Sequence, residues 1–415
     1  MRTSASDIRA QASTSDAPIR LRSYQWVWHI QSYGLLALIV LAFFPAWSHV
    51  QEYLFFSLFF TGCAAAYIER RQMIVASRLN IPIALWLGWI LLSVPFAIDP
   101  SYSVAEWRKV VVKVLEFYWA MLVLRTTEFD DMDGKVLSAV AAGSFVVCLY
   151  ALLDFIDRGG TWSDRLVRAR GPSSDYNWLS TYLVIVLPLL IAGAIRTRHL
   201  RTLCAYGGTA ALALTMQALS YTRAGWMAVL AQGLAFGGFT RRVRLVLGVL
   251  TGFFVTISLL LTLGLGRYQQ DTLDLRTLQT RAAVWTMMLQ EIKDHPVFGV
   301  GYGTKTFMRR FGDRLETAQG PGSHSLYLMT AMGSGVPALA FLLWALIAGV
   351  SECLRLARAH ADRPETAALL FGLALMIVGM AVRNLFDVMF IGGLACLFWL
   401  LLAAGMAHAS RAEVR

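Results

Sequence analysis

The sequence predicts an all-α, polytopic integral membrane protein. Of its 415 residues, 57% are hydrophobic and only 15% are charged, and the mean hydropathy is +0.56. Apolar runs of about 20 residues, the length of helix that crosses roughly 30 Å of hydrocarbon, recur along almost the whole chain. These runs leave little room for a separate soluble domain, and we expect none.

Twelve apolar segments account for the predicted transmembrane helices. They lie near residues 26–45, 53–68, 80–97, 109–124, 136–156, 178–195, 202–221, 224–239, 245–266, 324–350, 366–389 and 391–409. The first group occupies residues 26–266 and the second residues 324–409, with a large periplasmic loop at residues 267–323 between them. Residues 1–25 and 410–415 are the predicted cytoplasmic ends of the chain.

The basic residues predict that both ends of the chain lie in the cytoplasm. Cytoplasmic loops keep an excess of Lys and Arg, and every second loop of this chain is short and basic. The predicted cytoplasmic residues are Arg2, Arg9, Arg20, Arg22, Arg70, Arg71, Arg78, Arg125, Lys135, Arg196, Arg198, Arg201, Arg241, Arg242, Arg244, Arg355, Arg358 and Arg363. The net charge of +11 is therefore largely a matter of topology. It indicates contact with anionic membrane lipids at most, and no nucleic-acid partner.

Further basic residues fall on the opposite face, against the usual bias. They are Arg108, Lys109, Lys113, Arg158, Arg165, Arg168, Arg170, Arg223, Arg267, Arg276, Arg281, Arg309, Arg310, Arg314 and Arg383. Charges placed against the bias require a reason, and the simplest is a ligand of negative charge. The sequence therefore predicts an anion-binding outer face.

The long loop contains an amphipathic helix. Residues 277–295 have apolar side chains at helical spacing, with Thr277 as a candidate N-cap, Arg281 near the beginning and Pro296 as the stop. The following segment, FGVGYGTKTF, has glycines at alternate positions but no preceding strand, so it does not indicate a nucleotide loop. We expect a bend that brings backbone close to a ligand or to the membrane.

Common catalytic motifs do not occur in the sequence. It has no HExxH, CxxC or His-x-His pair, no GxSxG elbow and no Walker loop. The outer-face carboxylates form no obvious pair of the kind that glycoside hydrolysis uses. These carboxylates are Asp164, Asp175, Asp313, Glu316 and Asp387.

His324 is the best candidate for a catalytic group. It follows Gly-Pro-Gly-Ser and begins the apolar stretch HSLYLMTAMGSGVPALA. Imidazole titrates near neutral pH and suits a general base, although a ring that merely caps a helix start would look the same. Arg223, in SYTRAGWMAVL, is either a functional cation or an arginine that snorkels to the membrane interface. Arg168 and Arg170, before a bend at Gly171, are each explained more simply as solvated loop charges.

Together these segments resemble the O-antigen ligase and polymerase superfamily of bacterial membrane glycosyltransferases, and most closely its ligases. The ligase pattern is a histidine, then Asn, Ser or Gln, nine residues and Gly-x-x-Gly; His324, Ser325 and Gly335 match it. Ala338 stands where the second glycine is expected. The segments RGPSSDYNW, YTRAGW, TRAAVW and HPVFGVGYG also occur in the family's order, with Tyr176 where many relatives have proline.

The resemblance implies transfer of O-polysaccharide from undecaprenyl pyrophosphate to a sugar hydroxyl of the lipid A core. The reaction would take place at the periplasmic face of the inner membrane of a Gram-negative bacterium. On this basis we expect His324, Arg223 and Arg281 to be catalytic, with both arginines also binding the diphosphate. Arg168, Arg170 and Arg383 are further candidates for diphosphate binding.

The expected mechanism is direct displacement. His324 removes the proton of the acceptor hydroxyl, and diphosphate leaves as an anion stabilised by arginine, with inversion at the anomeric carbon. This chemistry calls for no metal and no cofactor. O-antigen polymerase and protein O-oligosaccharyltransferase stay open as alternatives, because they share the donor. A lipid-linked glycan transporter is a third alternative, although the sequence shows no inverted repeat.

Overall fold

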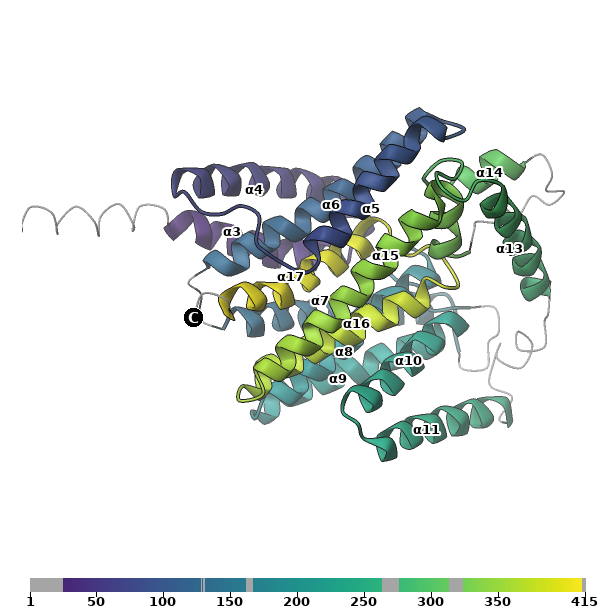
Figure 1. Cartoon of the computed structure of the whole chain (residues 1–415). Helices are drawn as coiled ribbons and strands as arrows, with labels where there is room; N and C mark the ends of the chain where they lie inside the picture. Colours follow the sequence, from purple (N-terminus) through teal and green to yellow (C-terminus); the bar gives the residue numbers. More distant parts are fainter. Residues whose placement is uncertain are drawn as a thin grey trace, which may run out of the picture.

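The computed structural model describes residues 25–127, 129, 131–161, 167–262, 276–312 and 324–412. In these ranges the regular structure is helical throughout, which confirms the all-α prediction (Figure 1). The α-helices are α3 (Gln25–Leu41), α4 (Ser48–Ile68), α5 (Asn80–Ser93), α6 (Pro100–Thr126), α7 (Met132–Asp157), α8 (Tyr176–Arg196), α9 (Leu200–Leu219), α10 (Arg223–Phe239), α11 (Val243–Thr262), α13 (Arg276–Asp294), α14 (Thr306–Phe311), α15 (Leu326–Ala359), α16 (Pro364–Arg383) and α17 (Gly392–Ala412). Two short 3-10 helices, η1 (Pro45–Trp47) and η2 (Val94–Phe96), complete the set in the described ranges.

Each of the predicted apolar segments coincides with one of these helices. Four of the described helices, α7, α8, α15 and α16, are long and apolar enough to cross a membrane. Two shorter apolar helices lie at residues 80–96 and 392–408. The chain is thus a helical membrane protein, while the figure of twelve membrane crossings stays a prediction.

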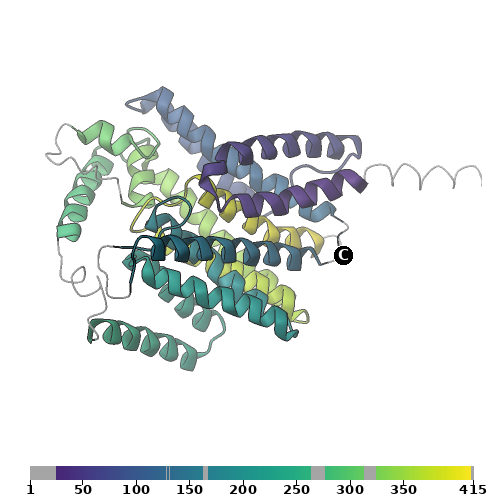
Figure 2. The same ribbon diagram turned by 180° about the vertical axis from the view of Figure 1, so that it is seen from behind.

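The core of the bundle is built around α8, whose side chains from Trp178 to Leu190 are all buried. Helix α16 packs on one side of it (Figure 1), and α7 and α9 pack on the other (Figure 2). Gln232 of α10 links α8 to α16, because its side-chain amide donates to the carbonyl oxygens of Val184 at 2.8 Å and Leu375 at 3.1 Å.

The helices run between two ends of the bundle. The start of α3 and the end of α17 lie at the same end of the bundle (Figure 1). The loop helices α13 and α14 lie at the other end, which we call the site end. The site end also holds the C-terminus of α16 and the N-terminus of α15.

Helix α6 differs from its predicted bounds. It begins at Pro100 rather than near residue 109, because Asp99 caps it by accepting the Tyr102 amide at 2.9 Å. Within this helix the Nζ of Lys113 lies 2.6 Å from Glu116 Oε1. Other basic residues of the outer face are also paired: Lys109 with Glu106, Arg309 with Asp99 and Arg310 with Glu291. The prediction of a generally anion-binding face is therefore too broad.

Helix α15 is interrupted at Gly335, where φ is +83° and ψ is 169°. The glycine-rich segment docks on this break: the amides of Val300 and Gly301 donate to the carbonyls of Met332 and Gly333 at 2.9 and 2.8 Å. The Val336 amide in turn donates to the Pro296 carbonyl at 2.8 Å. A Cβ at Gly335 would collide with the Val297 carbonyl. The close backbone approach expected of this segment is present, and its partner is α15.

The loop helix α13 occurs where the sequence predicts it. Thr277 lies inside the described helix rather than before it, so the predicted N-cap is wrong. The helix ends at Asp294, two residues before the predicted stop at Pro296. Several residues of the predicted outer face lie outside the described ranges, namely Asp164, Arg165, Arg267, Asp313, Arg314 and Glu316.

Candidate functional site

His324 stands immediately before the first turn of α15. Ser325 is the N-cap of that helix, and its hydroxyl accepts the Leu328 amide at 3.4 Å. The next amide, of Leu326, donates to the carbonyl of Asn384 at 3.0 Å, which ties the start of α15 to the end of α16. His324 itself has φ of +48°, a left-handed conformation that is uncommon for residues other than glycine. The helix start thus fixes the histidine beside the C-terminus of α16.

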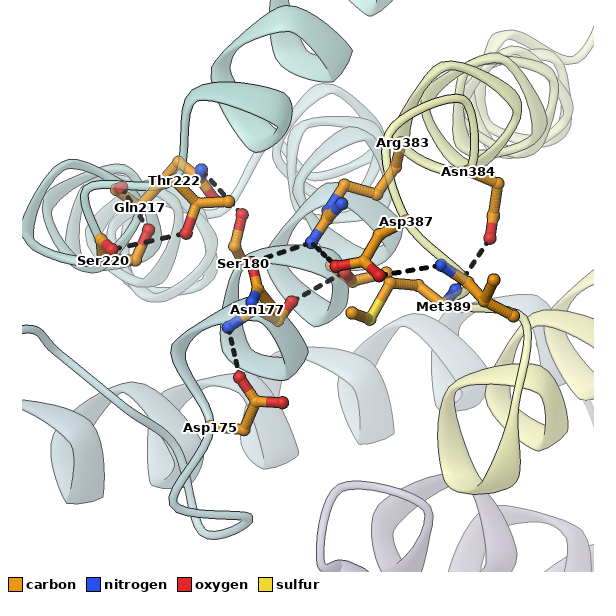
Figure 3. A network of polar contacts seen from close by, with 12 residues as sticks. Asp175, Asn177, Ser180, Gln217, Ser220, Thr222, Arg383, Asn384, Asp387 and Met389 are labelled. Atoms are coloured by element: carbon orange, nitrogen blue, oxygen red, sulfur yellow. Dashed lines mark hydrogen bonds and ion pairs between the residues drawn. The ribbon is translucent and has the colours of Figure 1, made fainter. Parts of the chain in front are cut away.

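Arg383 ends α16, and its side chain points toward Asn177 and Asp387 (Figure 3). Its side chain is only 1% exposed. One terminal nitrogen donates to Asn177 Oδ1 at 3.2 Å and lies 3.6 Å from Asp387 Oδ2. The Nε atom is buried and has no hydrogen-bond partner in the described part of the chain. Arg383 therefore carries a buried charge that protein groups satisfy only in part.

The turn that follows α16 positions Asp387. Asn384 Oδ1 accepts the Met389 amide at 2.9 Å, and Asp387 Oδ1 accepts the Val388 amide at 3.0 Å (Figure 3). The carboxylate is 21% exposed, so it faces the open side of the site. Asp387 is the carboxylate whose charge acts on Arg281, His324 and Arg383 alike.

Arg281 brings the loop helix α13 into the same cluster. Burial lowers the pKa of its guanidinium, Asp387 raises it and Arg223 lowers it further, so these groups lie within electrostatic reach of one another. Arg223 is the first residue of α10. The Nε of Arg281 and the indole N–H of Trp285, one turn later, are both buried without a hydrogen-bond partner among the described residues. Helix α13 thus presents two unused donors on one face.

The electrostatics of the cluster act on His324. Burial and the neighbouring Arg281 lower the pKa of its imidazole below the ordinary 6.5, and Asp387 opposes that shift. The ring is therefore neutral at neutral pH and has a lone pair available for a proton. This is the state that a general base requires.

Arg168 and Arg170 lie along the rim of the cluster. The guanidinium of Arg168 stacks 4.2 Å above the ring of Tyr176, which also lies within electrostatic reach of Arg281. Arg170 instead approaches Asp154 of α7, with its Nε 3.3 Å from Oδ2. The structure thus gathers His324 with three arginines and places the remaining two candidates beside them.

Two residues of the site, Asp387 and Asn177, have roles that the sequence did not predict. Asp387 was considered only as half of a carboxylate pair, and its actual partners are cations. Asn177 appeared in a family-like segment without a role, and it supplies the amide oxygen that holds Arg383. Its position at the start of α8, where the Asp175 cap accepts its amide at 2.7 Å, is the signal that could have indicated a role.

No three His, Cys, Asp or Glu side chains in the described ranges gather closely enough to hold a metal ion. The expectation that the protein uses no metal stays a prediction.

Comparison with known families adds to this geometry. Residues 208–343 match the family model described as O-antigen ligase. This segment is similar to the O-antigen ligase family. It contains Arg223, Arg281 and His324, while Arg168, Arg170 and Arg383 come from outside the match. A search of curated proteins gives no match to the chain. The O-antigen ligase family consists of membrane enzymes that transfer lipid-linked glycans, and the match confirms the predicted resemblance.

Proposed function

We propose that this protein transfers O-polysaccharide from undecaprenyl pyrophosphate to a sugar hydroxyl of the lipid A core, completing lipopolysaccharide. The proposal places the site end in the periplasm and the opposite, basic end in the cytoplasm of a Gram-negative inner membrane. Support comes from the match to the O-antigen ligase family together with the arrangement of charges around His324.

The observation that carries the proposal is the set of guanidinium groups that the protein leaves incompletely satisfied. The Nε atoms of Arg281 and Arg383 are buried without partners among the described residues. A buried donor without a partner costs about 1–3 kcal/mol, and more when it is charged. A diphosphate offers several anionic oxygens to such donors, and guanidinium forks bind them with paired, charge-assisted hydrogen bonds. We infer that Arg223, Arg281 and Arg383 bind the donor diphosphate.

In the proposed reaction, the neutral His324 accepts the proton of the acceptor hydroxyl. The hydroxyl oxygen forms a bond with the anomeric carbon of the donor glycan while the bond from that carbon to the diphosphate oxygen breaks. The bonding electrons leave with undecaprenyl pyrophosphate, whose added negative charge the arginines stabilise. A single displacement of this kind inverts the anomeric configuration, and a product that retains the configuration would contradict it.

The test is a reconstitution with purified components. Wild-type protein and His324→Ala are incubated with matched undecaprenyl pyrophosphate-linked O-polysaccharide and lipid A core, with EDTA and without nucleotide. We expect glycan on the lipid A core with the wild type and none with the variant. Electrophoresis of the lipid products gives the readout.

Other outcomes of the same experiment would replace the proposal. A longer glycan that stays on undecaprenyl pyrophosphate would make the protein an O-antigen polymerase. Transfer only when a protein acceptor is added would make it an O-oligosaccharyltransferase. Movement of intact donor across liposomes without any transfer would make it a transporter.

A further inference from the structure

A second cationic cluster lies next to the diphosphate arginines at the site end. Asp154, near the C-terminus of α7, accepts Arg158 through Nε at 2.8 Å and through Nη2 at 2.5 Å. Arg170 approaches the same carboxylate oxygen through its Nε at 3.3 Å. One carboxylate thus faces two guanidinium groups, and the cluster keeps a positive charge.

The cluster is joined to the site by a short chain of contacts. Arg158 also donates to the carbonyl of Arg168 at 2.7 Å, and the Arg168 side chain stacks on Tyr176. The amide of Ala169 donates to the Leu219 carbonyl at 2.9 Å, at the end of α9 and just before Arg223 begins α10. The two clusters are therefore neighbours, separated by the segment from Arg168 to Tyr176.

The two clusters differ in exposure. Arg383 in the diphosphate cluster is 1% exposed, whereas Arg158 and Arg170 are 25% and 38% exposed. Asp154 is the only ion-pair partner of Arg170 in the described ranges, and the contact uses only its Nε. The terminal nitrogens of Arg170 can therefore meet a ligand from solvent. A group bound here would lie outside the reacting centre.

Transfer brings two substrates to one histidine. If the donor diphosphate occupies Arg223, Arg281 and Arg383, an anionic acceptor approaching His324 meets an already neutralised cluster. Its own charged groups then require separate cations, because like charges repel at close range in a partly desolvated site.

We propose that Arg158 and Arg170 bind a phosphate substituent of the acceptor and hold its hydroxyl toward His324. This inference rests on the proposed function, because it assigns a site to the second substrate of that reaction. Both arginines are positioning residues. Asp154 orients them and limits their affinity for anions.

A purely structural role makes a different prediction for Asp154. If the ion pairs only fix the segment from Arg168 to α7, Asp154→Asn should behave like Arg158→Gln and Arg170→Gln. If the arginines bind the acceptor, Asp154→Asn removes a competing negative charge and keeps both cations. Its KM for the acceptor should then be unchanged or lower.

The experiment measures KM for the acceptor with two preparations of lipid A core, native and with its phosphates removed enzymatically. We expect Arg170→Gln and Arg158→Gln to raise KM for the native acceptor about tenfold, with little change for the dephosphorylated acceptor. KM for the donor should change by less than about twofold. The control is Arg196→Gln at the opposite end of the bundle, where the arginine pairs with Asp131.

Equal losses with both acceptor preparations, or an Asp154→Asn variant that loses acceptor affinity as the arginine variants do, would overturn the proposal. Binding of lipid A core to His324→Ala protein, which needs no turnover, separates this result from failure of the proposed function. A parallel arm with phosphatidylglycerol nanodiscs tests a lipid headgroup as the ligand. If Arg170→Gln weakens only that binding, the site belongs to the membrane lipid and the proposal fails.

Discussion

The two ends of the bundle differ in how fully the protein pairs their basic side chains. At the end away from the site, basic side chains meet carboxylates: Arg355 binds Glu352 at 2.6 and 2.8 Å, and His408 lies 3.0 Å from Asp133. At the site end Arg309 and Arg310 are also paired, but Arg281 and Arg383 each keep a buried Nε that no described residue satisfies. The charges of these pairs satisfy one another, whereas a buried charge without a full set of partners is costly. The difference is that one set of charges is satisfied within the protein, whereas the other keeps donors that the proposed diphosphate would use.

The largest difference in rate is expected between variants of two histidines: His324, the proposed general base, and His408, which is paired with Asp133. His324→Ala should lower the rate of glycan transfer by about 10²–10⁴-fold, the usual contribution of a general base. His408→Ala removes a paired ring at the opposite end and should leave the rate within about twofold. The measurement is the initial rate of transfer at saturating substrates. Equal losses in the two variants would mean that both histidines act through folding.

Arginine variants give the next largest contrast. Arg281→Gln should lower kcat/KM for the donor by about 10²-fold, because one stabilising cation of the leaving group is lost. Arg281→Lys should restore activity only in part, since lysine lacks the planar fork. Arg355→Gln, in which the lost side chain paired only with the protein, should change kcat/KM by less than about threefold. Donor titrations with each purified variant provide the values.

A glycine variant tests how far the stability of the fold depends on the break in α15, because it changes no charge in the site. Gly335→Ala forces a Cβ against the Val297 carbonyl at a φ of +83°, so the break in α15 and the docked glycine-rich segment must shift. We expect destabilisation of about 1–3 kcal/mol, seen as a lower melting temperature. Gly208→Ala, in α9 with open space around the new methyl group, should stabilise slightly. A melting temperature unchanged in Gly335→Ala would contradict the strain argument.

The smallest expected effects are shifts in pH dependence. Because burial and Arg281 lower the pKa of His324, activity should persist below pH 6.5 and fall as pH drops through that lowered pKa. Arg281→Gln removes a positive charge, favours the imidazolium and should move the acidic limb of kcat/KM to higher pH. Asp387→Asn removes a negative charge and should move it to lower pH. Shifts of the same sign in both variants would show that their charges do not set the pKa.

Much of the fold was predictable because hydrophobic periodicity is a local property. Every predicted apolar segment overlaps a described helix, and the bounds predicted for the amphipathic helix α13 differ by one residue at each end. Boundaries set by caps were less predictable: the start of α6 depends on Asp99, and the break in α15 depends on Gly335 meeting Val297. The second case involves a contact between distant segments, which residue patterns do not record.

The candidate site was predictable as a set of residue types and less so as an arrangement. His324, Arg223 and Arg281 were identified from their surroundings in the sequence, and the structure brings them together with Arg383. The difference between Arg170, which faces Asp154, and Arg383, which faces Asn177, could not be read from the chain. Both are arginines near a predicted membrane surface, and only their neighbours in space distinguish them.

The sequence by itself determined the helical membrane architecture and the resemblance to O-antigen ligases, and it singled out the histidine and arginines as candidates, because hydropathy and motif order are properties of the chain. The tertiary structure decided which cations are already neutralised and which are not, because ion pairing and burial depend on helices that are remote in sequence. Asp387 shows this most clearly. It is an ordinary loop carboxylate in the sequence, and the packing of α13, α15 and α16 makes it the counter-charge to the site.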